Sequence, residues 1–197
     1  MKLLLHCCCA PCTLSCADSL RGEGIEPRLF WYNPNIHPLS EYNARLACLK
    51  EFAANEKLKL EMQDEYGLRF FLAAVYRETE GTQLPARCRI CYSLRLEKTA
   101  SFAAENGYCA FSTSLLISTY QDHDAIRRIG NEAALKYGVD FFYRDFRPLF
   151  SESRRKARSL GLYMQKYCGC VFSEEERYAK KKEDKPQSTR SCTEEEN

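Results

Sequence analysis

Cysteines gather in three tight groups that lie far apart along this chain, and its fold has to account for them. The groups are Cys8-Cys9-x-x-Cys12, Cys88-x-x-Cys91 and Cys168-x-Cys170. Cysteines so close in sequence make poor disulfide staples, but they can direct several thiolates at one ion. Since long stretches of sequence separate the groups, only tertiary structure can bring them together. The spacing therefore predicts a fold that assembles a thiolate site from distant segments.

The cellular compartment decides how the chain's twelve cysteines are interpreted. In a secreted mini-protein they would form disulfides, whereas in a reducing compartment they indicate metal binding or catalysis. The apolar segment Met1–Leu5 is too short for a signal peptide, and no apolar run reaches the roughly 18–20 residues of a membrane helix. We therefore expect a cytoplasmic protein with no membrane segment. A net charge of +2 excludes a polycation that coats nucleic acid indiscriminately, but it permits local basic surfaces.

Short apolar segments alternate with segments of helical periodicity. Strands are predicted at residues 2–8, 28–32, 58–62, 109–116 and 139–143, and helices at 13–21, 40–56, 66–78, 90–105, 122–137 and 151–160, with Thr13 and Ser40 as N-caps. This alternation is typical of a parallel sheet covered on both faces. We predict a single α/β domain over residues 1–173, a three-layer Rossmann-like parallel sheet. Residues 174–197, which include Cys192, are polar and predicted to be a disordered tail.

Ligands of an open parallel sheet bind at the carboxyl ends of its strands, near the switch point of the topology. The first cysteine group follows the first predicted strand, so we expect the metal site at these strand ends. Cys88 and Cys91 are expected to open a helix whose N-terminus favours their thiolates. A [4Fe–4S] cluster needs four thiolates and would leave the others for redox work, whereas a structural zinc or inert buried thiols are the alternatives. Cys16, Cys48 and Cys109 are predicted to act as small apolar residues.

Five motifs occur in a fixed order along the chain: His6-Cys7-Cys8-Cys9-Ala10-Pro11-Cys12, Tyr32-Asn33-Pro34-Asn35-Ile36-His37-Pro38, Arg87-Cys88-Arg89-Ile90-Cys91-Tyr92-Ser93-Leu94-Arg95-Leu96, Asp145-Phe146-Arg147-Pro148 and Gln165-Lys166-Tyr167-Cys168-Gly169-Cys170-Val171-Phe172-Ser173. Together they resemble the motifs of the cobalamin-independent epoxyqueuosine reductases. The resemblance covers residues 2–173. It implies a fold like that of adenine-nucleotide hydrolases and a reduction of epoxyqueuosine, at the wobble position of tRNA, to queuosine. This reaction takes two electrons and two protons and yields a cyclopentene and water.

The resemblance also suggests a division of labour among the cysteines. Cys8, Cys9, Cys88 and Cys91 are assigned to a [4Fe–4S] cluster, because two groups then supply the four thiolates. Cys12, Cys168 and Cys170 are assigned to catalysis. Either Cys168 and Cys170 form a redox-active dithiol, or with Cys12 they hold a second, mononuclear iron. Some relatives carry aspartate in place of Cys12. An external electron donor is required, and a monomer is expected.

The proton donor and the RNA surface have several candidates. His37, Tyr143 and Asp145 lie on strand-end loops, although His37 could instead shape its loop and Asp145 could pair with Arg147. The segment Arg144–Lys166 is rich in Arg and Lys and could bind phosphates, with Tyr163 or Tyr167 stacking on a base. A solvated basic helix is the alternative.

Two other functions compete with the reductase. One is a zinc-stabilised RNA-binding domain without catalysis. The other is a cluster-dependent tRNA thiolation enzyme, against which the absence of a Ser-Gly-Gly-x-Asp-Ser pyrophosphate loop argues, because cysteines occupy its place.

Overall fold

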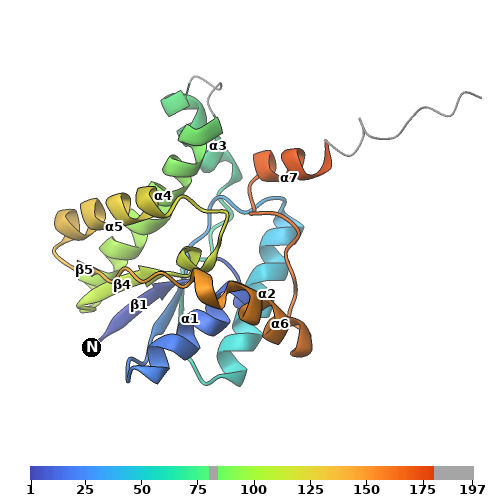
Figure 1. Ribbon diagram of the computed structural model, residues 1–197. Helices are drawn as coiled ribbons and strands as arrows, with labels where there is room; N and C mark the ends of the chain where they lie inside the picture. Colours follow the sequence, from blue (N-terminus) through green and yellow to red (C-terminus); the bar gives the residue numbers. More distant parts are fainter. Residues whose placement is uncertain (80–83, 180–197) are drawn as a thin grey trace, which may run out of the picture.

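The computed structural model describes residues 1–79 and 84–179 of the chain. In these ranges, parallel strands form one sheet in the order β3-β2-β1-β4-β5 (Figure 1). The strands are β1 (Leu3–His6), β2 (Arg28–Trp31), β3 (Leu60–Met62), β4 (Ala110–Thr113) and β5 (Asp140–Phe141). The helices are α1 (Ala10–Gly22), α2 (Leu39–Asn55), α3 (Leu68–Thr79), α4 (Leu84–Glu105), α5 (His123–Tyr137), α6 (Phe150–Ser159) and α7 (Val171–Tyr178), with short 3-10 helices η1 (Ser114–Ile117) and η2 (Arg147–Leu149).

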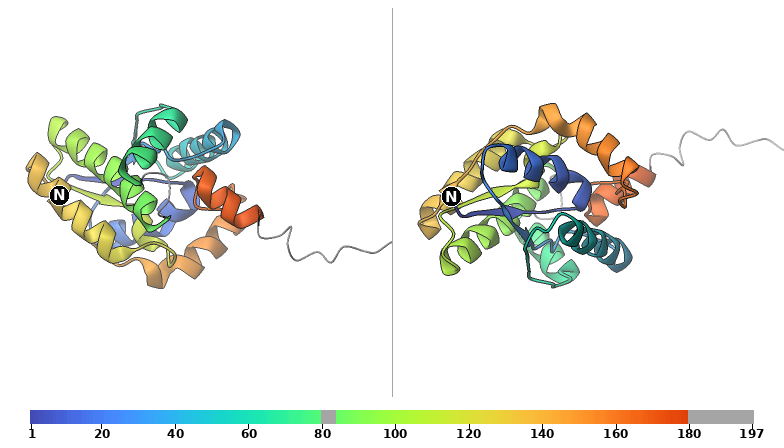
Figure 2. Two further views of the ribbon diagram at one scale, coloured as in Figure 1. Left: turned by 90° about the horizontal axis from the view of Figure 1, so that it is seen from above. Right: turned by 90° about the horizontal axis from the view of Figure 1, so that it is seen from below.

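Helices cover both faces of the sheet. α4 and α5 pack against each other on one side, and α1 and α6 pack against each other on the other side (Figures 1 and 2). The central strand β1 is buried along its whole length, because β2 and β4 flank it and helices cover it. Such strands are continuous apolar runs, as Leu3, Leu4 and Leu5 illustrate. The predicted three-layer α/β fold with a parallel sheet is confirmed.

The helix starts differ from the predicted ones. α1 begins at Ala10, because the Cys9 sulfur caps it by accepting from the Cys12 N–H at 3.4 Å and Pro11 is tolerated in a first turn. Thr13 is not the cap, since its hydroxyl donates to the Cys9 carbonyl at 2.8 Å from within that turn. The N-cap of α2 is Pro38, not Ser40.

Two further differences affect the site. α4 begins at Leu84, so Cys88 and Cys91 lie inside the helix and do not open it. α7 extends to Tyr178, which corrects the prediction that disorder begins at residue 174, since Phe172 gives this helix an apolar contact with the small buried cluster around Phe71 and Cys170. The rest of the predicted tail, with Cys192, lies outside the described residues. Among the described helices, none has the length and apolar composition needed to cross a bilayer.

Candidate metal centre

The first cysteine group lies at the switch point of the sheet. β1 and β4 are neighbours there, while the chain continues from β1 to β2 on the other side. The backbone N–H of Cys8 donates to the Ser114 hydroxyl, which follows β4, at 3.1 Å, and that hydroxyl lies 3.5 Å from the Cys8 sulfur. The two strand ends are therefore joined at the position where an open sheet binds its ligand, as the sequence predicted.

Three sulfur atoms meet at this point. Those of Cys8, Cys9 and Cys12 all lie within 4.8 Å of one another, and Cys8 and Cys9 are buried. Hydrogen bonds from the thiols of Cys12 and Cys9 hold the pKa of Cys8 well below its usual value. Among the described residues these three cysteines form the group that could hold a metal ion. The site therefore favours the thiolate form of Cys8 and places two further sulfurs beside it. This arrangement suits a metal that binds thiolates.

Gln165 contacts two of these sulfurs. Its Nε2 group lies 3.0 Å from the sulfur of Cys9 and 3.4 Å from that of Cys12. Gln165 was not among the predicted site residues. Its position at the head of the last cysteine motif is the sequence signal that could have identified it.

The second cysteine group contacts a buried arginine through Cys91. Arg95 is 1% exposed, and its Nη2 donates to the Cys91 sulfur at 3.0 Å. Its charge also acts on the thiols of Cys168 and Cys8, so it lies near all three cysteine groups. Burial raises the pKa of Cys91, which Arg95 opposes, and burial raises the pKa of Cys88 as well. The expected favouring of these thiolates by a helix N-terminus is therefore not seen; a buried guanidinium provides the compensating charge.

The third group is held by its backbone. Arg45 donates to the carbonyl oxygens of Cys168 and Tyr167 at 2.9 and 3.0 Å, while its Nε is paired with Glu41 at 2.7 Å. Gly169 has φ of +144°, a conformation that side-chain-bearing residues rarely adopt, and lies against Arg45. This clamp fixes the path of the chain between Cys168 and the buried Cys170.

The Asn33–His37 loop completes this clamp. The backbone N–H of His37 donates to the Gly169 carbonyl at 2.7 Å, and the Tyr167 hydroxyl donates to the His37 carbonyl at 2.5 Å. Burial lowers the pKa of His37 to about 4, so its ring is neutral. The loop therefore serves to position the third cysteine group, which is the loop-shaping alternative considered for His37.

A cavity of about 870 Å³ opens at the cysteines. Cys8, Cys12 and Cys168 line it together, so groups from both ends of the chain face one space. Its walls also carry Ser114, Leu115, Ser118, Tyr120, Gln121, Phe150, Arg154, Met164, Gln165, Lys166, Tyr167, Ser173, Glu176 and Arg177. Cys170 lies behind this wall, in an apolar cluster with Cys91, Phe71 and Val75. The arrangement can bind a molecule of nucleoside size beside reactive sulfur.

The proton-donor candidates lie elsewhere. His37, Tyr143 and Asp145 are absent from the described lining of the cavity. A hydrogen bond from Arg147 lowers the pKa of Asp145 to about 2, so this carboxyl is ionised and paired. Pairing with Arg147 was the alternative to a proton-donor role for Asp145. The Tyr143 hydroxyl lies 3.4 Å from His123 Nδ1.

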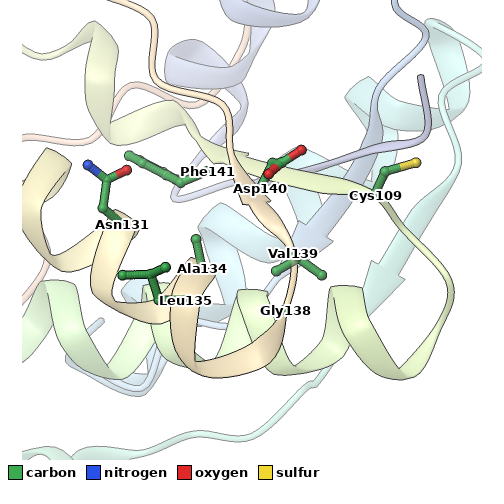
Figure 3. Close-up of a pocket in the computed structure, with 8 residues that line it drawn as sticks. All are labelled: Cys109, Asn131, Ala134, Leu135, Gly138, Val139, Asp140 and Phe141. Carbon is green, nitrogen blue, oxygen red and sulfur yellow. The ribbon is translucent and has the colours of Figure 1, made fainter.

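The remaining cysteines separate into buried and exposed ones. Cys7, Cys16 and Cys48 are buried, and the burial of Cys16 and Cys48 agrees with their expected role as small apolar residues. Cys109 is exposed, which corrects its expected burial, because it precedes β4 at the edge of a second hollow (Figure 3). That hollow is lined by Asn131, Ala134, Leu135, Gly138, Val139, Asp140 and Phe141 and contains none of the three cysteine groups. None of the cysteines in the described ranges forms a disulfide.

The donors present fit a metal that binds thiolates. Sulfur atoms gather in a buried site, where uncompensated thiolate charge would be unfavourable. Arg95 and Arg45, each 1% exposed, bring positive charge, and Gln165 and Ser114 bring hydrogen-bond donors. Such partners orient ligands and tune the metal that they hold.

Comparisons of the sequence with known proteins identify one family. The family model described as "Epoxyqueuosine reductase QueH" matches residues 3–176, a range that includes all three cysteine groups. A protein of that name from Dehalococcoides mccartyi is 40% identical over 179 residues, which cover 91% of this chain and 96% of the relative. Its namesake from Thermotoga maritima is 38% identical over 183 residues, which cover 90% and 93%. A solved structure from Methanocaldococcus jannaschii, described as a predicted subunit of tRNA methyltransferase, aligns over 83% of this chain and 91% of its own with 13% identity and a TM-score of 0.49.

Proposed function

The chain belongs to the epoxyqueuosine reductase QueH family and is an oxidoreductase, and we propose that it reduces the epoxide of epoxyqueuosine in tRNA to queuosine. The observation that carries this proposal is the cavity into which Cys8, Cys12 and Cys168 open together. A reductive deoxygenation needs electron-donating groups beside a bound nucleoside, and cysteines are part of the lining of this cavity. The cytoplasm, where tRNA is modified, is the proposed compartment.

We propose a [4Fe–4S] cluster as the cofactor, with Cys8, Cys9, Cys88 and Cys91 as its ligands. Such a cluster supplies electrons one at a time from an external donor. The closeness of Cys8 and Cys9 supports their part in this set, and the contact of Arg95 with Cys91, together with its charge acting on Cys8, supports the link between the two groups. Cobalamin is not required in this scheme.

The remaining cysteines are proposed to act on the substrate. Cys12 and Cys168 line the cavity, whereas Cys170 lies behind it. As a dithiol, Cys168 and Cys170 would release two protons and two electrons on forming a disulfide, which balances the conversion of an epoxide to an alkene and water. Alternatively, the two cysteines and Cys12 hold a mononuclear iron. In both forms the Arg45 clamp fixes the position of Cys168.

The tRNA is proposed to lie across the basic side of the cavity. Arg154, Lys166 and Arg177 line that wall, and phosphates bind such groups. Tyr167 lines the cavity as well, but its hydroxyl is engaged with His37 and its ring lies near Arg45. The protein is proposed to act as a monomer.

Metal content and turnover of the anaerobically purified protein test this function. We expect a brown protein with about four irons per chain, and a fifth if the mononuclear site is filled. It should convert epoxyqueuosine in tRNA to queuosine when a chemical reductant is supplied. Cys9→Ser and Cys88→Ser should each lose iron, because each removes a proposed ligand.

Two variants sharpen the test. Cys168→Ala should keep most of the iron and lose turnover, and Cys192→Ser, outside the described residues, should change neither. A colourless protein with about one zinc that binds tRNA without turning it over would instead identify a zinc-stabilised RNA-binding domain. Loss of all iron in Cys168→Ala would place this residue among the cluster ligands.

A further inference from the structure

An exposed aromatic ring stands at the rim of the cysteine cavity. Tyr120 is 82% exposed, yet it belongs to the lining that Cys8, Cys12 and Cys168 share. It lies in the turn between η1 and α5. A large aromatic side chain left in water at the entrance of a cavity is available for contact with a ligand.

The turn around Tyr120 is fixed on both sides. The Tyr120 N–H donates to the Ser118 hydroxyl at 3.2 Å, and Asp122 caps α5 by accepting from Ala125 at 2.9 Å. Gln121 accepts from the Tyr92 hydroxyl at 2.9 Å and its Nε2 lies 3.6 Å from the Cys168 sulfur. Two consecutive residues of this turn therefore face different parts of the cavity. Gln121 lies near the sulfur of Cys168, and Tyr120 exposes its ring at the rim.

The Tyr120 ring packs against Phe150, and Phe150 in turn contacts Arg154. Tyr120 meets Phe150 edge-to-face, with ring centroids 6.0 Å apart. The guanidinium of Arg154 lies 5.6 Å from the centroid of the Phe150 ring, and both residues line the cavity. Since most of Tyr120 is exposed, an area of its ring remains for a second planar group. Arg154 places a cation within the same rim, where a phosphate beside that planar group would lie.

We propose that Tyr120, supported by Phe150 and Arg154, is a stacking platform for the nucleobase that enters the cavity. This inference rests on the proposed function, because the base in question is the modified guanine whose side group must reach the cysteines. A base has to leave its neighbours in the anticodon loop to enter a cavity, and stacking on an aromatic ring replaces the contacts that it loses. A T-shaped support holds the ring ready for this contact at little loss of side-chain freedom.

Binding of two RNA hairpins tests the platform. One is an anticodon stem–loop with guanosine at the wobble position, and the other is the same RNA without a base there. Tyr120→Ala should weaken binding of the first roughly five- to a hundredfold and leave binding of the second unchanged. Tyr120→Phe should bind like the unaltered protein. Tyr76→Ala removes a tyrosine that is 56% exposed on α3, outside the cavity lining, and serves as the matched control.

A spectroscopic readout follows from the single tryptophan of the chain, Trp31, which is buried. In Tyr120→Trp the new indole should be quenched by the guanosine hairpin and not by the abasic one. Equal affinities of Tyr120→Ala and Tyr76→Ala, or an equal loss on both hairpins, would overturn the platform even if the enzyme is active. A protein that never reduces the epoxide but shows the base-dependent loss would contradict the reductase and support the platform. Absence of RNA binding would overturn both.

Discussion

At the scale of single residues, amide and guanidinium groups contact the sulfur atoms of the site. The Nε2 group of Gln165 lies near the sulfurs of Cys9 and Cys12, while its Oε1 atom is buried without a hydrogen-bond partner among the described residues. The one side chain thus supplies donors to two sulfurs and keeps an acceptor beside the cavity. Donors to sulfur stabilise the more negative, reduced state of a metal–thiolate centre.

We predict that Gln165→Leu lowers the reduction potential of the iron-loaded protein. A net hydrogen bond is worth about 1 kcal/mol, which corresponds to about 40 mV for a one-electron step. Loss of the contact to Cys9, a proposed ligand, should therefore shift the potential by a few tens of millivolts to more negative values. A redox titration followed by absorbance measures this shift independently of turnover.

Gln121→Leu is the matched control, because Gln121 places its Nε2 3.6 Å from the sulfur of Cys168, which is not a proposed cluster ligand. It should leave the potential of the cluster unchanged. A shift in Gln121→Leu with none in Gln165→Leu would show that the ligands have been divided wrongly between the groups.

At the scale of elements, α6 combines a buried seam with a basic outer face. Ser153 and Ala157 are buried, and the Ser153 hydroxyl donates to the Pro11 carbonyl of α1 at 2.7 Å. Lys156 pairs with Asp18 of α1 at 2.6 Å. Arg155 and Arg158 are exposed on the same helix, next to the wall of the cavity that Arg154 lines. α6 therefore carries charge beside the site without supplying sulfur to it.

We predict that Arg155→Glu combined with Arg158→Glu weakens tRNA binding at least tenfold at low salt. Each phosphate contact releases counterions, so losing two contacts should reduce the slope of log affinity against log salt by roughly 1.4 to 1.8. Iron content should not change. Binding assays across a range of salt concentrations measure both effects.

The pair Arg127→Glu and Arg128→Glu on α5 is the control, since it makes the same change of charge on exposed positions of the helix that covers the other face. Its effect should be small. Equal losses for the two pairs would mean that net charge alone governs binding, and no loss for either would mean that the RNA lies elsewhere.

The sequence predicted the elements well where burial dictates the pattern. Strands such as Leu3–His6 lie between neighbours and helices, so their apolar runs are short and unbroken. The helix starts were harder to predict, because Pro11 and Pro85 read as breaks although a first turn tolerates proline.

The location of the first cysteine group could be predicted, because strand ends are readable from the apolar pattern. Its partners could not. Arg45 and Gln165 contact residues that only the fold brings near, and the charge of Arg95 acts on the distant Cys8 and Cys168, whereas arginine and glutamine in a sequence usually indicate exposed positions. The place of Tyr120 in the cavity wall could not be predicted either, because its local sequence does not indicate a contact with the distant Phe150.

At the scale of the whole molecule, the site depends on a few long-range links between its segments. The loop at His37 and helix α2 hold the third cysteine group, Arg95 lies near all three groups, and Ser114 joins the ends of β1 and β4. The linking residues His37, Arg45, Arg95 and Ser114 are buried, so the assembly of the site and the stability of the fold are coupled. A change in the protonation of a buried linking residue should therefore be visible in the unfolding of the whole domain.

His37 provides this last prediction, because it is fully buried and burial lowers its pKa to about 4 from 6.5. Between these two values the unfolded chain binds a proton that the folded protein does not, so the free energy of unfolding falls as the pH is lowered through this range. Relative to pH 7, this residue should account for a loss of about 1 to 2 kcal/mol at pH 5. Urea unfolding of the metal-free protein should show His37→Asn to be less stable at pH 7 but less sensitive to acid by this amount. An equal acid sensitivity of both proteins would mean that His37 is protonated in the folded state, and that the link between its loop and the third cysteine group tolerates the charge.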